Sequence, residues 1–132
     1  MSAELNIQLN LEASSGNFRA SFRPNSITPD MATLISSDLS QNITTSAFQA
    51  LGIGVSVSAG GYYWFRNLST STSTTFDPSI KIAMGATNGA GTSTPFLNLR
   101  PGEFALGRCV TTTMCALSST ATADLQFGIL SA

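Results

Sequence analysis

The chain has 132 residues, the length of one ordinary domain, and its charge excludes several classes of protein. Only 10% of the residues are Asp, Glu, Lys or Arg, against about 25% in a typical domain, and the net charge is −1. No basic run is present to neutralise phosphates, which excludes ordinary nucleic-acid binding. About a third of the chain is Ser, Thr or Asn, which predicts an uncharged polar surface suited to protein–protein packing or to the coat of an extracellular β-domain.

Residues 4–23 have the pattern of a β-hairpin. The segment "ELNIQLNLE" alternates polar and apolar residues, and "NFRASFR" repeats this alternation after the turn residues "SSGN". The apolar side of the first strand holds Leu5, Ile7, Leu9 and Leu11, and that of the second holds Phe18, Ala20 and Phe22. This pairing is regular enough for residues 1–23 to be exchanged between subunits.

The rest of the chain consists of short segments with a period of two. We predict strands at 31–37, 41–51, 62–68, 79–85, 95–99, 103–110, 113–118 and 121–130, with a loop or bulged edge at 52–61 and a loop at 86–94. In the last strand one face should hold Ala121, Ala123, Leu125, Phe127 and Ile129. "RPGE" places Pro and Gly at the central positions of a type II turn.

No segment longer than ten residues has a helical period. The expected fold is therefore all-β: residues 1–132 form a single-domain antiparallel β-sandwich, jelly-roll-like, with about nine or ten short strands.

Two cysteines, Cys109 and Cys115, bracket "VTTTM". A tight turn between them would allow a disulfide, whereas a single strand would separate them by about 20 Å. The N-terminal residues have neither the positive charge nor the apolar core of a secretory signal, so we expect folding in a cytoplasm and two free, buried thiols. With no histidine and only two cysteines, we expect no zinc site and no cofactor.

The acidic residues give no enzyme signature. They are spread singly along the chain at Glu4, Glu12, Asp30, Asp38, Asp77, Glu103 and Asp124. Two of them could converge as a glycosidase pair from distant strands, but turn and outward positions favour solvated roles. "GVSVSAGG" lacks a glycine that a nucleophile elbow requires, and no histidine is present to act as its base. We therefore expect no enzymatic activity.

The aromatic segment "GGYYWFRNL" carries the candidate binding residues. On a strand, Tyr63 and Phe65 point to one face, while Tyr62, Trp64 and Arg66 point to the other. One set fills the core, and the other packs under a loop, contacts another subunit or forms a ligand platform. Tyr, Trp and Arg are enriched in interface centres and also stack on sugars and bases. The sequence therefore allows all three roles for the outer set.

The order of the segments "GGYYWFRNLSTS", "SIKIAMG", "PFLNLRPGEFALGR" and "ATADLQFGIL" resembles the small virion structural proteins of tailed bacteriophages, of the capsid-decoration or head-fibre kind. The resemblance covers roughly residues 40–130. It implies a jelly-roll-like subunit, usually trimeric, that sits on an assembled phage particle and has no catalytic residues.

We therefore expect a homo-oligomeric capsid decoration or cement protein. It would be made in the host cytoplasm, incorporated into the virion and bound to other virion proteins such as the major capsid protein, with no nucleic-acid or membrane partner. The alternative is a carbohydrate- or receptor-binding module of a phage tail or fibre, in which Trp64 and Tyr62 stack on the ligand.

Overall fold

The computed structural model describes residues 3–4, 8, 10–15, 18–23, 30–31, 39–52, 61–70, 77–85, 93–108 and 113–130. They form strands and connecting turns and no helix. The strands are β1 (Ala3–Glu4), β2 (Leu11–Ser15), β3 (Phe18–Phe22), β4 (Asp30–Met31), β5 (Leu39–Ile43), β6 (Gln49–Ala50), β7 (Tyr62–Asn67), β8 (Ile80–Met84), β9 (Pro95–Leu99), β10 (Phe104–Arg108), β11 (Met114–Ser118) and β12 (Ala123–Leu130).

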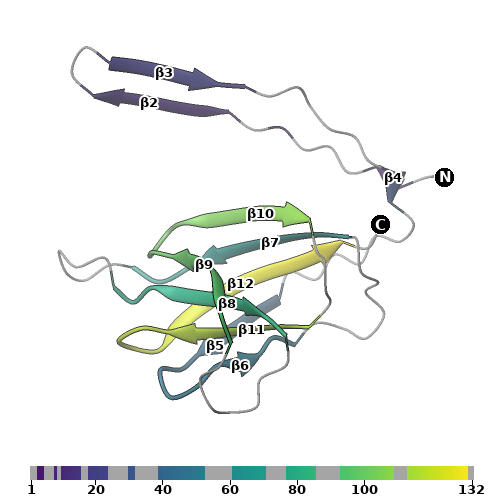
Figure 1. The fold of residues 1–132 in the computed structure, drawn as a ribbon, viewed down its shortest axis with the longest axis vertical. Helices are drawn as coiled ribbons and strands as arrows, with labels where there is room; N and C mark the ends of the chain where they lie inside the picture. The colour runs from purple at the N-terminus through teal and green to yellow at the C-terminus, as the bar shows by residue number, and fades with distance from the viewer. Residues whose placement is uncertain are drawn as a thin grey trace.

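Two four-stranded sheets make up the body of the molecule (Figure 1). Their strand orders are β10-β7-β12-β5 and β6-β11-β8-β9, and every pair is antiparallel. The predicted all-β class is confirmed, and the two sheets are consistent with the predicted sandwich. The described residues form twelve strands where nine or ten were expected; β1, β4 and β6 are only two residues long.

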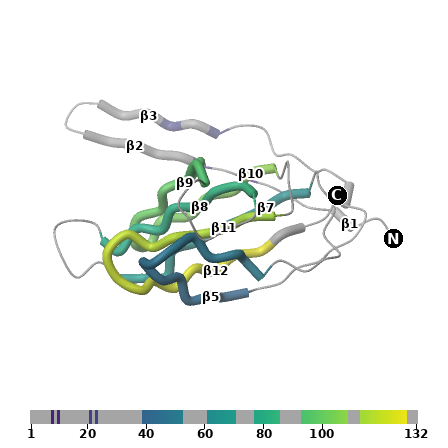
Figure 2. Tube along the Cα trace, turned by 60° about the horizontal axis from the view of Figure 1, so that its bottom comes forward, coloured from purple at the N-terminus to yellow at the C-terminus, as the bar shows by residue number. Residues whose placement is uncertain are grey.

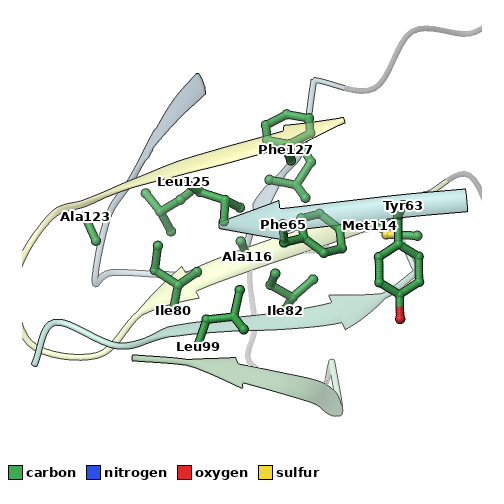
Figure 3. Packing of buried hydrophobic residues seen from close by; sticks show 12 residues of the cluster. Tyr63, Phe65, Ile80, Ile82, Leu99, Met114, Ala116, Ala123, Leu125 and Phe127 are labelled. Carbon is green, nitrogen blue, oxygen red and sulfur yellow. The ribbon is translucent and has the colours of Figure 1, made fainter. Parts of the chain in front are cut away.

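The hydrophobic core lies between these two sheets (Figure 3). From the first sheet it receives Phe65 and Phe127, which are cross-strand neighbours with ring centroids 6.4 Å apart. From the second it receives Ile80, Ile82 and Met114, all fully buried or nearly so. Burial of one such side chain contributes about 1.5–3 kcal/mol, so this cluster holds the two sheets together.

Strand β12 follows the predicted alternation over most of its length. Ala123, Leu125 and Phe127 are buried, as expected. Ala121 is exposed because it lies in the bend before the strand begins, which corrects the prediction at that position. The side chain of Ile129 lies outside the described residues.

The prediction of one strand over 41–51 is wrong. Strand β5 ends at Ile43, and the chain bends before entering β6 in the other sheet. Thr44 holds this corner, because its N–H donates to Gln49 Oε1 at 2.9 Å and its hydroxyl lies 3.2 Å from Ser46 Oγ. The Gln49 side-chain oxygen thus replaces a ladder partner for the Thr44 N–H, while the Thr44 C=O accepts the N–H of Ser118.

The N-terminal hairpin is shorter than predicted. β2 pairs with β3, with Leu11 opposite Phe22 and Ala13 opposite Ala20. Gln8 and Asn10 are not in a strand, and β1 pairs with β4 instead of extending the hairpin. The hairpin is a two-stranded sheet of its own (Figure 1). Figure 2 shows the strands of the two main sheets from a second direction. Of the expected strand 31–37, only Met31 is described.

The turn between β9 and β10 is the predicted type II turn. Glu103 N–H donates to Arg100 C=O at 3.0 Å, and Gly102 has φ 81°. A positive φ at this position is what type II geometry requires, and glycine adopts it without strain. The turn carries the chain from one main sheet to the other.

Cys115 is a free thiol buried in β11, as predicted. Its Sγ lies 3.7 Å from Ala83 C=O, to which the thiol donates. Cys109, like most of the predicted loops 52–61 and 86–94, lies outside the described residues.

Candidate functional site

The aromatic strand β7 divides its side chains between the two faces of its sheet. Tyr63 and Phe65 are buried in the core, while Tyr62 and Trp64 are half-buried on the outer face and Arg66 is exposed there. The predicted division of the two sets is therefore confirmed. The outer set is the candidate site, and its surroundings decide what it can do.

The neighbouring strands place a row of side chains on each side of this outer set. Paired residues of antiparallel strands share a face, so the registers define this surface. On β10 the partners of Arg66, Trp64 and Tyr62 are Phe104, Leu106 and Arg108. On β12 their partners are Gln126, Gly128 and Leu130.

Trp64 lies over the backbone of β12. A Cβ atom placed on Gly128 would lie 2.7 Å from Cε2 and 3.0 Å from Cζ2 of the indole. Gly128 is consequently buried although it is on the outer face. Part of the Trp64 surface therefore packs against its own sheet. For this residue, packing within the subunit is favoured over the other two roles considered for the outer set.

Phe104 and Leu106 are the most exposed large apolar residues of the outer face. Phe104 is 67% exposed and Leu106 is 46% exposed. Leu106 is opposite Trp64 and diagonal to Tyr62, and Phe104 is opposite Arg66 and diagonal to Trp64. We call Tyr62, Trp64, Phe104 and Leu106 the apolar strip. Arg66 and Arg108 lie on the same face along the same strands.

Sequence reasoning missed Phe104 and Leu106. The segment "EFALGR" was predicted as a strand, in which the large Phe104 and Leu106 alternate with small residues. In an ordinary strand the large residues would face the core, whereas here they face outward. Its small residues, Ala105 and Gly107, face inward because the ring of Tyr63 lies over Gly107. That alternation was visible in the sequence, but its direction depended on where Tyr63 packs.

Asn67 ends β7 and clamps the two sheets together. Its buried side-chain amide donates to Pro78 C=O at 2.9 Å and to Leu99 C=O at 3.1 Å, and its Oδ1 accepts the N–H of Ser69 at 3.0 Å. Asn67 begins an Asn-Leu-Ser glycosylation sequence, but a buried amide with these partners is not accessible as an acceptor.

Asn67 also joins two segments on which the phage resemblance was based. Its backbone accepts the N–H of Gly102 at 2.9 Å and donates to Glu103 C=O at 3.0 Å. The segments "RNL" and "RPGE" are therefore in contact. Their role in holding the fold is sufficient to explain why both occur in the sequence.

Three carboxylates, those of Asp77, Glu103 and Asp124, have hydrogen-bond partners that the structure describes. Asp77 accepts a hydrogen bond from Ser119 Oγ, Glu103 from Arg100 N–H and Asp124 from Asn42 Nδ2, each at 2.8–2.9 Å. Each acid thus has a different partner in a different part of the fold. Among the described residues, no three His, Cys, Asp or Glu side chains form a group that could hold a metal ion.

Comparison with protein-family models, curated protein sequences and solved structures finds no match to this chain. In the part of the chain that the structure describes, no helix is long and apolar enough to cross a membrane. The functional conclusion therefore depends on the surface of the molecule itself.

Proposed function

We propose that this chain is a structural component of a bacteriophage virion, a homo-oligomeric decoration or cement protein that binds the outer surface of the particle. The observation that carries the proposal is the apolar strip formed by Tyr62, Trp64, Phe104 and Leu106, with Phe104 and Leu106 exposed, in a chain of low charge. Exposed apolar patches on sheet faces are typical of protein–protein contacts.

The surface chemistry suits a stable contact with other proteins. Aromatic side chains and Arg are enriched at interface centres, and Arg66 and Arg108 lie on the same face as the aromatic residues of the strip. The Ser, Thr and Asn residues that make up about a third of the chain are desolvated at lower cost than charged side chains. Several copies related by symmetry would add their weak contacts to the particle, so that the assembly binds far more tightly than one copy.

The trimer and the major capsid protein as partner come from the resemblance described above, and the jelly-roll-like topology comes from that resemblance and from the pattern of short strands. The proposed location is the virion, after synthesis in the host cytoplasm.

Two measurements test this function. Sedimentation velocity of the purified full chain at micromolar concentration should give the mass of an oligomer, with a trimer expected. Peptide mass spectrometry of gradient-purified particles from a lysate that contains the chain should find it at a constant ratio to the most abundant shell protein. A monomer whose peptides remain in the soluble fraction would overturn the proposal.

A second function, a carbohydrate- or receptor-binding module of a phage tail or fibre, is favoured by one observation. Tyr62 and Trp64 lie on the same face beside Arg66, an arrangement on which a sugar ring could stack. The two functions differ in which residues matter. A ligand platform predicts that Trp64→Ala abolishes binding on a glycan array while Phe104→Ser has no effect; an assembly surface predicts that Phe104→Ser weakens association and that no glycan is bound.

A further inference from the structure

The four outer strands of the two sheets differ in how well their edges are protected. Native proteins block sheet edges with prolines, bulges, short strands or covering segments, because an open edge pairs with other chains. Strand β6 is only two residues long. Strand β9 begins with Pro95 and is bulged at Phe96, since Ile82 pairs with Leu97 and Ala83 pairs with Pro95. Both strands are therefore protected.

A side chain of the edge strand β5 holds the segment that follows it. Gln41 Nε2 donates to Ala50 C=O at 3.0 Å, and Gln41 Oε1 accepts the N–H of Gly52 at 3.1 Å. This side chain ties the next segment of the chain against β5.

In the part of the chain that the structure describes, strand β10 has none of these devices. It pairs with β7 over five consecutive residues without a bulge and contains neither proline nor lysine. Among the described strands, β7 is its sole partner. Asn67 N–H donates to Glu103 C=O, so the antiparallel alternation directs the N–H and C=O groups of Phe104 and Leu106 toward the outer edge.

The hairpin β2–β3 has the complementary property. Its register places Leu11 opposite Phe22 and Ala13 opposite Ala20, so the apolar positions of the alternation share one face. A two-stranded hairpin is marginally stable by itself and needs an apolar surface or a further strand. It forms a sheet of its own in this chain.

Within its own chain the hairpin pairs with no strand of the two main sheets, and Phe104 and Leu106 of β10 are 67% and 46% exposed. The connection from the hairpin to β5, residues 24–38, can span at most about 50 Å at 3.3–3.6 Å per residue. That upper bound exceeds the roughly 30 Å diameter of a small domain, so the connection is long enough for the hairpin to extend beyond its own subunit.

We propose that the hairpin β2–β3 of one copy adds to the β10 edge of a neighbouring copy and extends the sheet β10-β7-β12-β5. The backbone groups of Phe104 and Leu106 then gain strand partners. Their side chains gain apolar cross-strand neighbours from the hairpin, which stabilise an antiparallel pair. This inference rests on the proposed function, because it specifies how copies of the chain associate.

Substitution at the edge tests the contact in the full chain. Leu106→Lys places on β10 the residue with which natural edges are blocked, and it should weaken self-association at least tenfold in sedimentation equilibrium. Leu68→Lys is the matched control, because Leu68 is 42% exposed but lies outside β10, and it should change the association constant less than twofold.

Crosslinking identifies the occupant of the edge. In chains with Cys109→Ala and Cys115→Ala, one tagged copy carries Leu106→Cys and a differently tagged copy carries Ala13→Cys or Ala20→Cys. Oxidation should link the two different copies. A link between two Leu106→Cys copies instead would show pairing of β10 with β10, and a link within one doubly substituted chain would show that its own hairpin docks; either result overturns the proposal.

The outcomes separate this inference from the proposed function. If the chain is monomeric in every variant, homo-oligomeric assembly itself is wrong. If the unsubstituted chain is oligomeric but Leu106→Lys has no effect and no hairpin crosslink forms, the assembly stands and the hairpin contact is wrong.

Discussion

At the scale of single residues, two consecutive aromatic side chains of β7 each lie over a glycine of a neighbouring strand. Tyr63 lies over Gly107 of β10 on the inner face, and Trp64 lies over Gly128 of β12 on the outer face. Any side chain at these positions would occupy the space of the ring. These glycines serve to admit an aromatic ring onto the sheet, and neither has a positive φ.

Gly128→Ala should displace the Trp64 indole from β12. The added Cβ would lie 2.7 Å from Trp64 Cε2, so the ring must swing toward solvent, at a cost of about 1 kcal/mol in stability. Since the chain has a single Trp, its emission maximum should move to longer wavelength. Gly52→Ala is the control, because its nearest atom, Gln41 Oε1, is 3.8 Å away; equal emission spectra for both variants would contradict this packing.

Asn67→Ala should be strongly destabilising. The substitution leaves the C=O groups of Pro78 and Leu99 without this donor at a buried position, which costs about 2–4 kcal/mol in total. Asn42→Ala is the matched control, because Asn42 is exposed and makes one hydrogen bond to Asp124; it should cost less than about 1 kcal/mol. Urea unfolding compares the two variants, and similar midpoints would show that Asn67 is not a clamp.

At the scale of elements, strand β10 determines where the apolar strip lies, through its place at the edge of the sheet and the direction in which its large side chains point. It is the edge strand of its sheet, its small residues face the core and its large residues face outward. The Pro101–Gly102 turn sets where it begins, because that turn ends in Glu103 next to Asn67 of β7. The turn therefore determines the register in which Leu106 comes beside Trp64.

Gly102→Ala should destabilise the fold through the backbone alone. No atom lies within 4 Å of the added Cβ, so the cost is that of holding alanine at φ 81°, about 1–2 kcal/mol. Gly102→Asn should cost less, because Asn tolerates the left-handed region. The free energy of unfolding from urea titration measures both variants; equal losses for Ala and Asn would contradict a conformational origin.

At the scale of the whole molecule, the low charge determines the kind of association we expect. The chain has six Lys and Arg and seven Asp and Glu residues among 132. The apolar strip and an open backbone edge offer burial and hydrogen bonds, neither of which is screened by salt. Assembly driven by such contacts differs from assembly driven by charge in its response to ionic strength.

Self-association should therefore be nearly independent of salt. Between 0.1 M and 1 M salt the screening length falls from about 10 Å to about 3 Å, which removes long-range contributions between exposed charges. We expect the association constant from sedimentation equilibrium to change less than about threefold over this range. A decrease of tenfold or more would show that Arg66, Arg108 or other charges carry the contact.

The alternation of single segments was sufficient to predict much of this fold. β7, β8, β9, β10, β11 and β12 lie within the predicted strands, and the two faces of β7 are as expected. The corner at Thr44 was missed because a Ser/Thr-rich, β-branched segment has the composition of a strand. Only the structure shows that the backbone N–H of Thr44 bonds to the Gln49 side chain instead of to a neighbouring strand.

The candidate site was predicted in part. Tyr62, Trp64 and Arg66 were placed on the correct face, but Phe104 and Leu106 were not recognised as their neighbours. Period-two alternation says that two residues share a face and cannot say which face is the core. For β10 that choice was made by Tyr63, a residue on another strand.

The sequence by itself determined the all-β class, the approximate extent of the central and C-terminal strands and the type II turn, because alternation and turn chemistry act over a few neighbouring residues. The tertiary structure decided the order of the strands, the exposure of Phe104 and Leu106, the clamp at Asn67 and the open edge of β10. Those features arise from contacts between segments far apart in the chain, such as Asn67 with Leu99 and Trp64 with Gly128, and no local pattern contains them.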